Sequence, residues 1–213
     1  MWHSMPFLDV DTDAARKIFD VNLWGQFDTT QAFLPLLLAA QRKGQKTTVV
    51  LVSSLAGTGP TPFSSIYGAS KAAADYVFNT LREELKPWDI NVVCLRTGAV
   101  KSNMINNRVG GGDERSKLPA NSVYQIARDP VELFMSGKAA EAGVPAEEWA
   151  QMVVKNLERP VPPKVVFGGG YAFMAWIMQY LPVPASATQG MVNRITGLEA
   201  VQKAVKESKL QGN

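Results

Sequence analysis

The sequence predicts an α/β protein built on a parallel sheet. Residues 47–53 and 90–96 are two short runs of apolar and β-branched side chains, which are typical of buried strands. Between them, helical periodicity covers residues 65–85 and ends before Pro87. A strand, a helix and a strand in this order form a βαβ unit, whose right-handed crossover makes the two strands parallel.

The preceding segment predicts a long helix over residues 11–41. Apolar side chains recur there at roughly helical spacing, and the acidic and hydroxyl side chains at 11–13 are candidates for the N-cap. Gly44 ends this helix before the first strand. After that strand, a loop rich in glycine, proline and serine at 55–64 leads into the central helix.

The second half of the chain is less regular. Residues 97–128 contain three consecutive glycines and no sustained period, so we predict a long irregular loop. The elements expected after this loop are a helix at 130–142, a helix at 145–157, a strand at 161–167 and an apolar helical region at 168–213. No internal repeat is evident, and we expect a single domain over residues 1–213.

Composition narrows the range of functions. A hydrophobic content of 46% and a charged content of 19% indicate a globular chain, and its basic residues are too scattered to favour nucleic acid as a partner. His3 and Cys94 are the only histidine and cysteine, so we expect no metal site and no intrachain disulfide. As a helix the apolar tract 171–181 is ~16 Å long, against ~30 Å for a bilayer core. It is too short to span a membrane but fits a membrane surface.

The strongest chemical signal is the pair Tyr67 and Lys71. Four residues apart on a helix, the two side chains emerge on one face. A free tyrosine titrates near ~10, and a neighbouring ammonium group favours the phenolate, which suits acid–base catalysis. Such pairs also arise on ordinary solvated helix faces. Ser54 strengthens the catalytic interpretation, because it stands at the carboxyl end of a predicted parallel strand, where open α/β sheets bind ligands.

Four segments together resemble the short-chain dehydrogenase family: VSSLAG at 52–57, YGASK at 67–71, FDVNLWG at 19–25 and TGAVKS at 97–102. The resemblance implies the C-terminal part of a Rossmann-like fold, in which a parallel sheet lies between two layers of helices. It also implies an oxidoreductase that uses a nicotinamide cofactor, with residues 97–128 as a loop on the substrate side.

The resemblance assigns roles to individual residues. It implies that Tyr67 is the general acid or base, that Lys71 lowers the pKa of Tyr67 and binds the nicotinamide ribose, and that Ser54 holds the substrate oxygen. Asn22 would support a proton relay by fixing the helix backbone around a water. The implied cofactor contacts come from Asn22, Tyr67, Lys71, Thr97, Gly98, Val100 and Ser102.

Some of these positions depart from the family pattern or have ordinary structural alternatives. Thr97-Gly98 stands where the family more usually has Pro-Gly, and Ser102 stands where a threonine commonly contacts cofactor phosphate. Ser54 also fits a role as a turn cap, and Asn22 fits a satisfied polar group within a helix. Both interpretations remain open on the sequence.

The tail adds a clue about the substrate. An aromatic, apolar segment at 167–177, the sequence LPVP at 181–184 and residues 8–11 resemble fungal NADPH-dependent 1-acyldihydroxyacetone-phosphate reductases. That resemblance implies NADP(H)-dependent reduction of a ketone on an apolar or lipid substrate, on the cytoplasmic side of the endoplasmic reticulum or of lipid droplets. Residues 171–181 would supply a peripheral membrane contact or cover an acyl chain. The same segment equally fits ordinary core or an interface in a homo-oligomer. A retinol- or hydroxysteroid-type dehydrogenase is the alternative enzyme.

The family's N-terminal cofactor-binding segment is not recognisable in the sequence. Neither a T-G-x-x-x-G-x-G turn nor an N-N-A-G segment occurs, and Gly57-Thr58-Gly59 follows the wrong strand and opens no helix. We therefore expect a truncated form, with an unpaired apolar edge on the strand at 47–53 and weakened cofactor affinity. An inactive fragment that acts as an interaction module is a further alternative.

Overall fold

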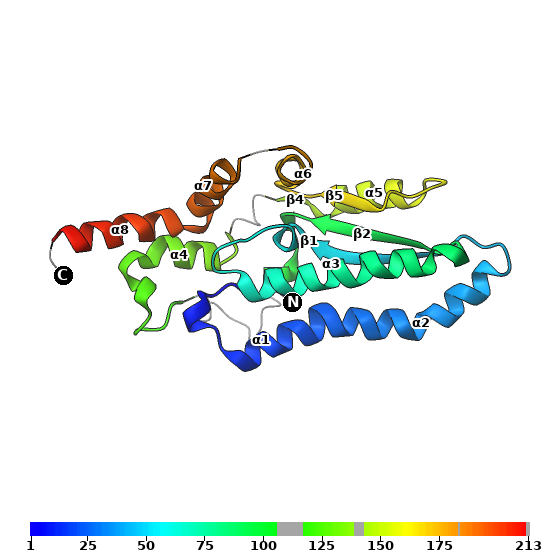
Figure 1. Ribbon diagram of the computed structural model, residues 1–213, viewed down its shortest axis with the longest axis horizontal. Coiled ribbons are helices and arrows are strands. Elements are labelled where there is room, and N and C mark those ends of the chain that lie inside the picture. Colours follow the sequence, from blue (N-terminus) through cyan, green and yellow to red (C-terminus); the bar gives the residue numbers. More distant parts are fainter. Residues whose placement is uncertain (106–116, 139–142, 183, 212–213) are drawn as a thin grey trace.

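The computed structural model describes residues 1–105, 117–138, 143–182 and 184–211. Its centre is a three-stranded parallel sheet in the order β1-β2-β5 (Figure 1). β1 covers Thr48–Ser54, β2 covers Asn91–Thr97 and β5 covers Val165–Gly168. The predicted βαβ unit is confirmed, with the first two strands each displaced by one residue from the predicted bounds.

The helical segment before the sheet runs close to the predicted bounds. α1 covers Thr12–Phe19, α2 covers Gly25–Gln41, and a π-helical turn at Asp20–Trp24 joins them. Asp11 is the N-cap, because its carboxylate accepts a hydrogen bond from the backbone N–H of Ala14 at 2.8 Å. The π turn was not predicted, since one additional residue in a turn hardly changes the apolar spacing.

Helices on both faces of the sheet give three layers. α3 covers Ser65–Leu85, as predicted, and Figure 1 shows it running along the sheet with α2 beside it. The buried core of this face consists of Leu23, Val49, Leu51, Ala74, Phe78, Leu85, Ile90, Val92 and Cys94. α5, Ala146–Leu157, covers the opposite face. The core there consists of Val93, Leu95, Val153 and Val166.

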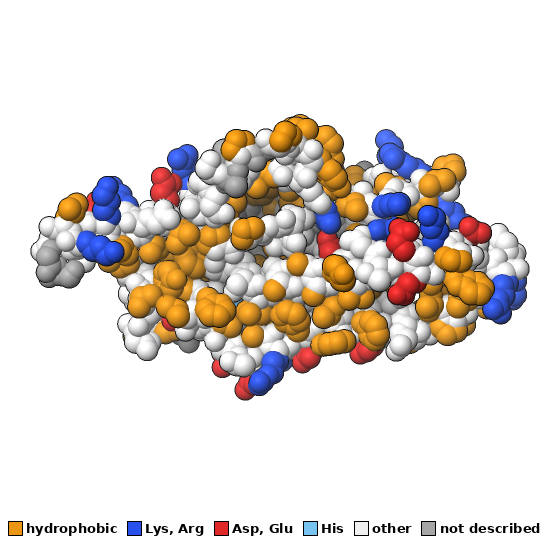
Figure 2. All heavy atoms as spheres, in the orientation of Figure 1, with side chains coloured by type: hydrophobic (Ala, Val, Ile, Leu, Met, Phe, Trp, Pro, Cys, Tyr) orange, Lys and Arg blue, Asp and Glu red, His pale blue; other side chains and the backbone are white. Residues whose placement is uncertain are grey.

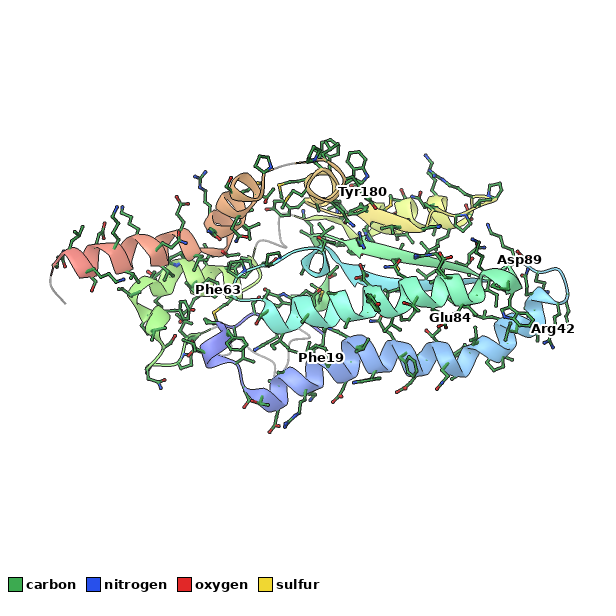
Figure 3. The ribbon with its side chains drawn as sticks, in the orientation of Figure 1. Phe19, Arg42, Phe63, Glu84, Asp89 and Tyr180 are labelled. Atoms are coloured by element: carbon green, nitrogen blue, oxygen red, sulfur yellow. The ribbon has the colours of Figure 1, made fainter. Side chains whose placement is uncertain are left out.

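A second group of helices lies at one end of the molecule (Figure 1). These helices are α4 (Arg128–Met135), α7 (Ala185–Thr196) and α8 (Leu198–Leu210). Phe63 lies just before α3 and beside this group (Figure 3), and its ring contacts Tyr124 and Phe134. The remaining helix, α6 (Ala172–Tyr180), follows β5 directly.

Two predicted elements of the second half are shorter in the structure. The strand predicted at 161–167 begins only at Val165, because Pro162 and Pro163 cannot donate ladder hydrogen bonds. The helix predicted at 130–142 ends at Met135, followed by Gly137 with φ 72°, a left-handed conformation that terminates helices. The last residues of that prediction, 139–142, lie outside the described part of the chain.

The loop predicted at 97–128 contains more structure than expected. β3 (Val100–Lys101) pairs in parallel with β4 (Val144–Pro145), and short 3₁₀ turns occupy Asn103–Ile105 and Val123–Ala127. Residues 106–116, which include the three glycines, lie outside the described residues. Elements this short leave no periodic signal in a sequence.

The unpaired edge expected on the first strand is present. Within the described ranges, β1 pairs with β2 along one side and with no strand along the other. Val50 and Val52 are 36% and 48% exposed, on the face opposite Val49 and Leu51, because α5 packs on β2 and β5 instead. None of the helices in the described ranges has both the length and the apolarity needed to cross a bilayer.

Candidate active site

α3 presents Tyr67 and Lys71 on its buried face. The two residues are 5% and 9% exposed. Lys71 Nζ donates a hydrogen bond to the Val52 carbonyl oxygen of β1 at 3.0 Å. The helix and the strand therefore hold the pair in one place, near the carboxyl end of the sheet.

Ser54 is the last residue of β1 and faces Tyr67. Its Oγ accepts a hydrogen bond from the backbone N–H of Ala56 at 3.2 Å and also forms a hydrogen bond with Tyr67. The turn after Ser54 packs tightly on α3, because a Cβ on Gly57 would lie 2.9 Å from the Ala72 nitrogen. Ser54 thus caps this turn and also faces the tyrosine, and its role in holding the substrate oxygen stays a prediction.

Burial dominates the electrostatics of the pair. Desolvation raises the pKa of Tyr67, and the hydrogen bond with Ser54 opposes this shift. Desolvation lowers the pKa of Lys71, and the negative charge of Asp75 opposes that shift. The spacing to Lys71 predicted a lowered pKa for Tyr67, and the structure gives a raised one. Burial destabilises the phenolate by more than the neighbouring groups stabilise it.

Asn22 lies behind Tyr67 and outside the lining of the cavity described below. It belongs to the π-helical turn and is 2% exposed. Its Oδ1 accepts from the Met1 amino group at 2.8 Å, and its Nδ2 donates to the Met1 carbonyl oxygen at 2.9 Å and to Ser70 Oγ at 3.1 Å. The structure therefore places Asn22 as a satisfied buried amide against the helix that carries Tyr67.

Thr97 and Gly98 end β2 beside Ser54, as the parallel register requires. Thr97 and Ser54 are direct partners in the ladder. A Cβ on Gly98 would lie 1.9 Å from the Gly170 carbonyl oxygen, so only glycine fits this crossing of two backbones. Thr97 Oγ1 is buried and has no hydrogen-bond partner among the described residues. Val100 and Ser102 lie beyond the cavity lining: Val100 is in β3, and Ser102 is exposed.

A cavity of about 550 Å³ opens beside these residues. Ser54, Tyr67, Lys71, Thr97 and Gly98 all line it. The opposite wall is mainly apolar and is formed by Phe134 of α4, by Met174, Ala175 and Met178 of α6, and by Val192 and Ile195 of α7. The residues of α6 belong to the apolar segment that was considered as a cover for an acyl chain, whereas Phe134, Val192 and Ile195 were not predicted from the sequence.

One signal for the wall exists in the sequence of α6. Met174 and Met178 are four residues apart and share the face toward the cavity. Phe173, Trp176 and Tyr180 are 74%, 42% and 53% exposed, on the outer side (Figure 3 labels Tyr180). Spacing separates the two faces, but only the fold shows which one faces the cavity.

Two comparisons with known proteins decide the family. A family model described as short chain dehydrogenase matches residues 1–110. A short-chain dehydrogenase/reductase of Pestalotiopsis microspora is 36% identical over 205 residues, which cover 96% of this chain and 68% of that relative. The chain belongs to the short-chain dehydrogenase family. The resemblance seen in the four sequence segments is confirmed.

Further members of the short-chain dehydrogenase family extend the comparison. The NADPH-dependent 1-acyldihydroxyacetone phosphate reductase of Saccharomyces cerevisiae is 31% identical, over 84% of this chain and 57% of that protein. A crystal structure of a short chain dehydrogenase from Burkholderia cenocepacia, in complex with NADP, matches with a TM-score of 0.62 and 22% identity, over 90% of this chain and 65% of that one. The predicted Rossmann-like fold is confirmed. The chain spans 57% to 68% of the length of the two curated relatives.

Short-chain dehydrogenases bind a nicotinamide cofactor, and the residues at the cavity fit its nicotinamide and ribose end. Thr97 Oγ1 is a buried hydroxyl at the cavity wall that lacks a partner among the described residues. The Lys71 ammonium group donates one hydrogen bond, to Val52, and has further N–H groups to offer. Tyr67, Lys71 and Thr97 are the residues that would hold this part of the cofactor.

Proposed function

We propose that this short-chain dehydrogenase reduces a ketone on an apolar or lipid substrate with NADP(H), using Tyr67 as the proton donor. The observation that carries the proposal is the composition of the cavity. Two hydroxyl groups, of Ser54 and Tyr67, and the Lys71 ammonium group face a wall of apolar side chains from α6 and α7. A ketone oxygen requires donors where its charge develops, and an apolar chain requires an uncharged wall.

The chain's own residues supply the proton chemistry. Ser54 Oγ donates a hydrogen bond to the substrate carbonyl oxygen, and Tyr67 Oη transfers its proton to that oxygen as the alcohol forms. A nicotinamide cofactor, when bound, supplies the hydride to the carbonyl carbon. Because burial raises the pKa of Tyr67, the phenol keeps its proton at neutral pH and has it to donate. The Lys71 ammonium then stabilises the phenolate.

The favoured substrate is a 1-acyldihydroxyacetone phosphate, whose reduction gives lysophosphatidic acid. Support comes from the similarity to the NADPH-dependent reductase of that substrate from Saccharomyces cerevisiae. The same similarity is our reason for proposing NADP(H) as the cofactor. The methionines of α6 and the aliphatic side chains of α7 offer an adaptable apolar wall for an acyl chain.

A retinol- or hydroxysteroid-type substrate is the second candidate, and one observation favours it. Among the described residues that line the cavity, Lys71 is the only one with a formal charge. A phosphate group inside the cavity would find no further basic partner from these residues, whereas a neutral retinoid or steroid needs none.

The outer face of α6 supports a peripheral membrane contact on the cytoplasmic side of the endoplasmic reticulum or of lipid droplets. Figure 2 shows hydrophobic side chains gathered over this helix, and Phe173 and Trp176 are stacked there with ring centroids 6.3 Å apart. Residues 165–193 contain no Asp, Glu, Lys, Arg or His. Exposed tryptophan and tyrosine on an uncharged helix suit the boundary between water and lipid. A second copy of the chain is the alternative occupant of this face.

A binding and turnover experiment tests the proposed function. The 213-residue chain is titrated with NADPH and with NADH, and cofactor oxidation is followed with an acyldihydroxyacetone phosphate, with retinal and with a ketosteroid. We expect NADPH to bind more tightly than NADH and the acyl ketone phosphate to turn over fastest. A folded chain that binds neither cofactor would contradict the proposal and favour an inactive interaction module.

A further inference from the structure

A stripe of buried polar side chains extends from the cavity along α3. Tyr67, Lys71 and Asp75 follow one another at intervals of four residues, and each is at most 9% exposed. Residues at this spacing lie above one another on one face of a helix. Asp75 is therefore the next side chain after Lys71 on the face that packs against the sheet.

Strand β2 fixes the carboxylate of Asp75. Arg96 Nε donates to Asp75 Oδ2 at 2.9 Å, and the two side chains are only 11% and 7% exposed. Arg96 Nη1 also donates to Gln179 Oε1 of α6 at 2.6 Å, and its guanidinium group lies 5.6 Å from the centroid of the Phe167 ring. Three contacts thus fix the Arg96 guanidinium group, and the hydrogen bond from Arg96 in turn fixes Asp75 Oδ2.

The second oxygen of Asp75 has no such contact. Asp75 Oδ1 is buried and forms no hydrogen bond with any described residue. A buried carboxylate with one unpaired oxygen is costly unless a nearby charge stabilises it. Lys71, one helical turn away, is the neighbouring buried cation on the same helix.

We propose that Asp75 is a positioning residue for Lys71: its carboxylate, fixed by Arg96, keeps the Lys71 ammonium group charged and directed at the end of β1. This inference rests on the proposed function, in which a charged Lys71 stabilises the phenolate of Tyr67. Burial alone would favour the neutral amine. The Asp75 carboxylate offsets that cost from the same face of α3, one helical turn further from the cavity.

Among the groups around Lys71, the Asp75 carboxylate favours the charged form of the lysine, and the cations disfavour it. Burial lowers the pKa of Lys71, and Asp75 raises it. The Met1 amino group and Lys71 repel each other, since Lys71 lowers the pKa of that amine. Arg96 is a further like charge on the other side of Asp75. Tyr67 is neutral while its own pKa is raised. Asp75 is thus the group that opposes the loss of the Lys71 charge.

Carbon-13 NMR titration of the lysine side chains tests the proposal without any turnover. The Lys71 resonance is identified by its loss in Lys71→Met. In Asp75→Asn, which keeps the shape and removes the charge, we expect the Lys71 pKa to fall by about one unit, further from its ordinary value. Asp13→Asn is the matched control: it removes an exposed carboxylate paired with Arg16, and the Lys71 pKa should not move.

The sign of the shift separates this role from a structural one. If Asp75 only held the fold together, its replacement would admit water and raise the Lys71 pKa toward its ordinary value. An unchanged or raised pKa in Asp75→Asn therefore overturns the proposal. Should that variant fail to fold, Asp75→Leu combined with Arg96→Met decides, because it replaces the buried ion pair by apolar side chains of similar size. The Lys71 pKa then has to fall, and an unchanged or raised pKa overturns the proposal.

Failure of this role and failure of the proposed function give different results. An unaltered Lys71 pKa in Asp75→Asn contradicts the positioning role alone, whatever the enzyme reduces. Absent turnover in the substrate panel contradicts the proposed function alone. Where turnover is measurable, Asp75→Asn should also move the alkaline limb of the rate profile to lower pH, because Lys71 loses its proton earlier.

Discussion

The side-chain amide of Asn22 donates to Ser70 Oγ at 3.1 Å, and that hydroxyl donates to the backbone carbonyl oxygen of Tyr67 at 2.7 Å. Asn22 is thereby coupled to Tyr67 through the backbone of α3 and not through the cavity. The π-helical turn carries the amide into this position, and turns of this kind occur frequently at functional sites.

Replacement of Asn22 should destabilise the fold. Asn22→Ala removes the partner of the Met1 amino group and of Ser70, so we expect the free energy of unfolding to fall by about 1–3 kcal/mol. Urea denaturation measures this change. Gln151→Ala, at an exposed position of α5, is the control and should change stability by less than about 0.5 kcal/mol. Equal stability of the two variants would mean that the buried amide contributes nothing.

The crossing of backbones at Gly98 gives a second prediction. A Cβ there would lie 1.9 Å from the Gly170 carbonyl oxygen, so Gly98→Ala forces two backbone segments apart. We expect the free energy of unfolding to fall by about 1–3 kcal/mol. The control is Gly59→Ala, where an added Cβ meets nothing within 4 Å. Thermal unfolding of both variants decides, and similar melting temperatures would contradict the close approach.

The raised pKa of Tyr67 predicts how stability depends on pH. The folded chain retains this proton above the ordinary value of 10.0, where the unfolded chain loses it. The contribution of the buried, protonated Tyr67 to the free energy of unfolding is therefore complete below pH 10.0. It is lost as the pH rises through the pKa of Tyr67 in the folded chain. Urea denaturation between about pH 8 and about pH 11 should show a larger loss for the wild type than for Tyr67→Phe. The lowered pKa of Lys71 makes stability depend on pH in the opposite sense, but both proteins contain Lys71, so this effect cancels in the comparison. Equal losses of stability in the wild type and in Tyr67→Phe would contradict the raised pKa of Tyr67.

The outer face of α6 predicts binding to lipid vesicles. Phe173→Ser combined with Trp176→Ser removes two exposed aromatic rings without touching the cavity residues, and we expect it to abolish co-flotation with phosphatidylcholine vesicles. Tyr76→Ser removes a ring that is 78% exposed on α3 and should leave flotation unchanged. A wild-type chain that does not float, or an unaffected double variant, would remove the membrane contact and favour a second copy of the chain on this face.

The features that were predictable from the sequence are those that depend on short-range spacing. The bounds of α3 follow from its period and from Pro87, and the interval between Tyr67 and Lys71 places both on one face. Ser54 follows from its position at the end of a buried strand. In each case residues close in sequence determine the geometry, so local patterns suffice.

The features that were missed depend on contacts between distant segments. Asp75 and Arg96 are 21 residues apart and meet only because α3 packs on β2. The apolar wall from α6 and α7 requires the C-terminal helices to fold back over the sheet. The pKa of Tyr67 moves upward because of burial, which its spacing to Lys71 does not reveal. Ser102 lies outside the cavity lining although its segment matches the family.

The central claim, that Tyr67 donates the proton in an NADPH-dependent reduction, is tested most directly by comparing two tyrosines of α3. NADPH oxidation with the ketone substrate is measured for the wild type, for Tyr67→Phe and for Tyr76→Phe, whose ring is 78% exposed. We predict that Tyr67→Phe lowers kcat by about 10²–10⁴-fold with nearly unchanged NADPH affinity, because only the proton donor is lost, while Tyr76→Phe retains wild-type turnover. Retention of wild-type kcat in Tyr67→Phe would contradict the assignment of the site.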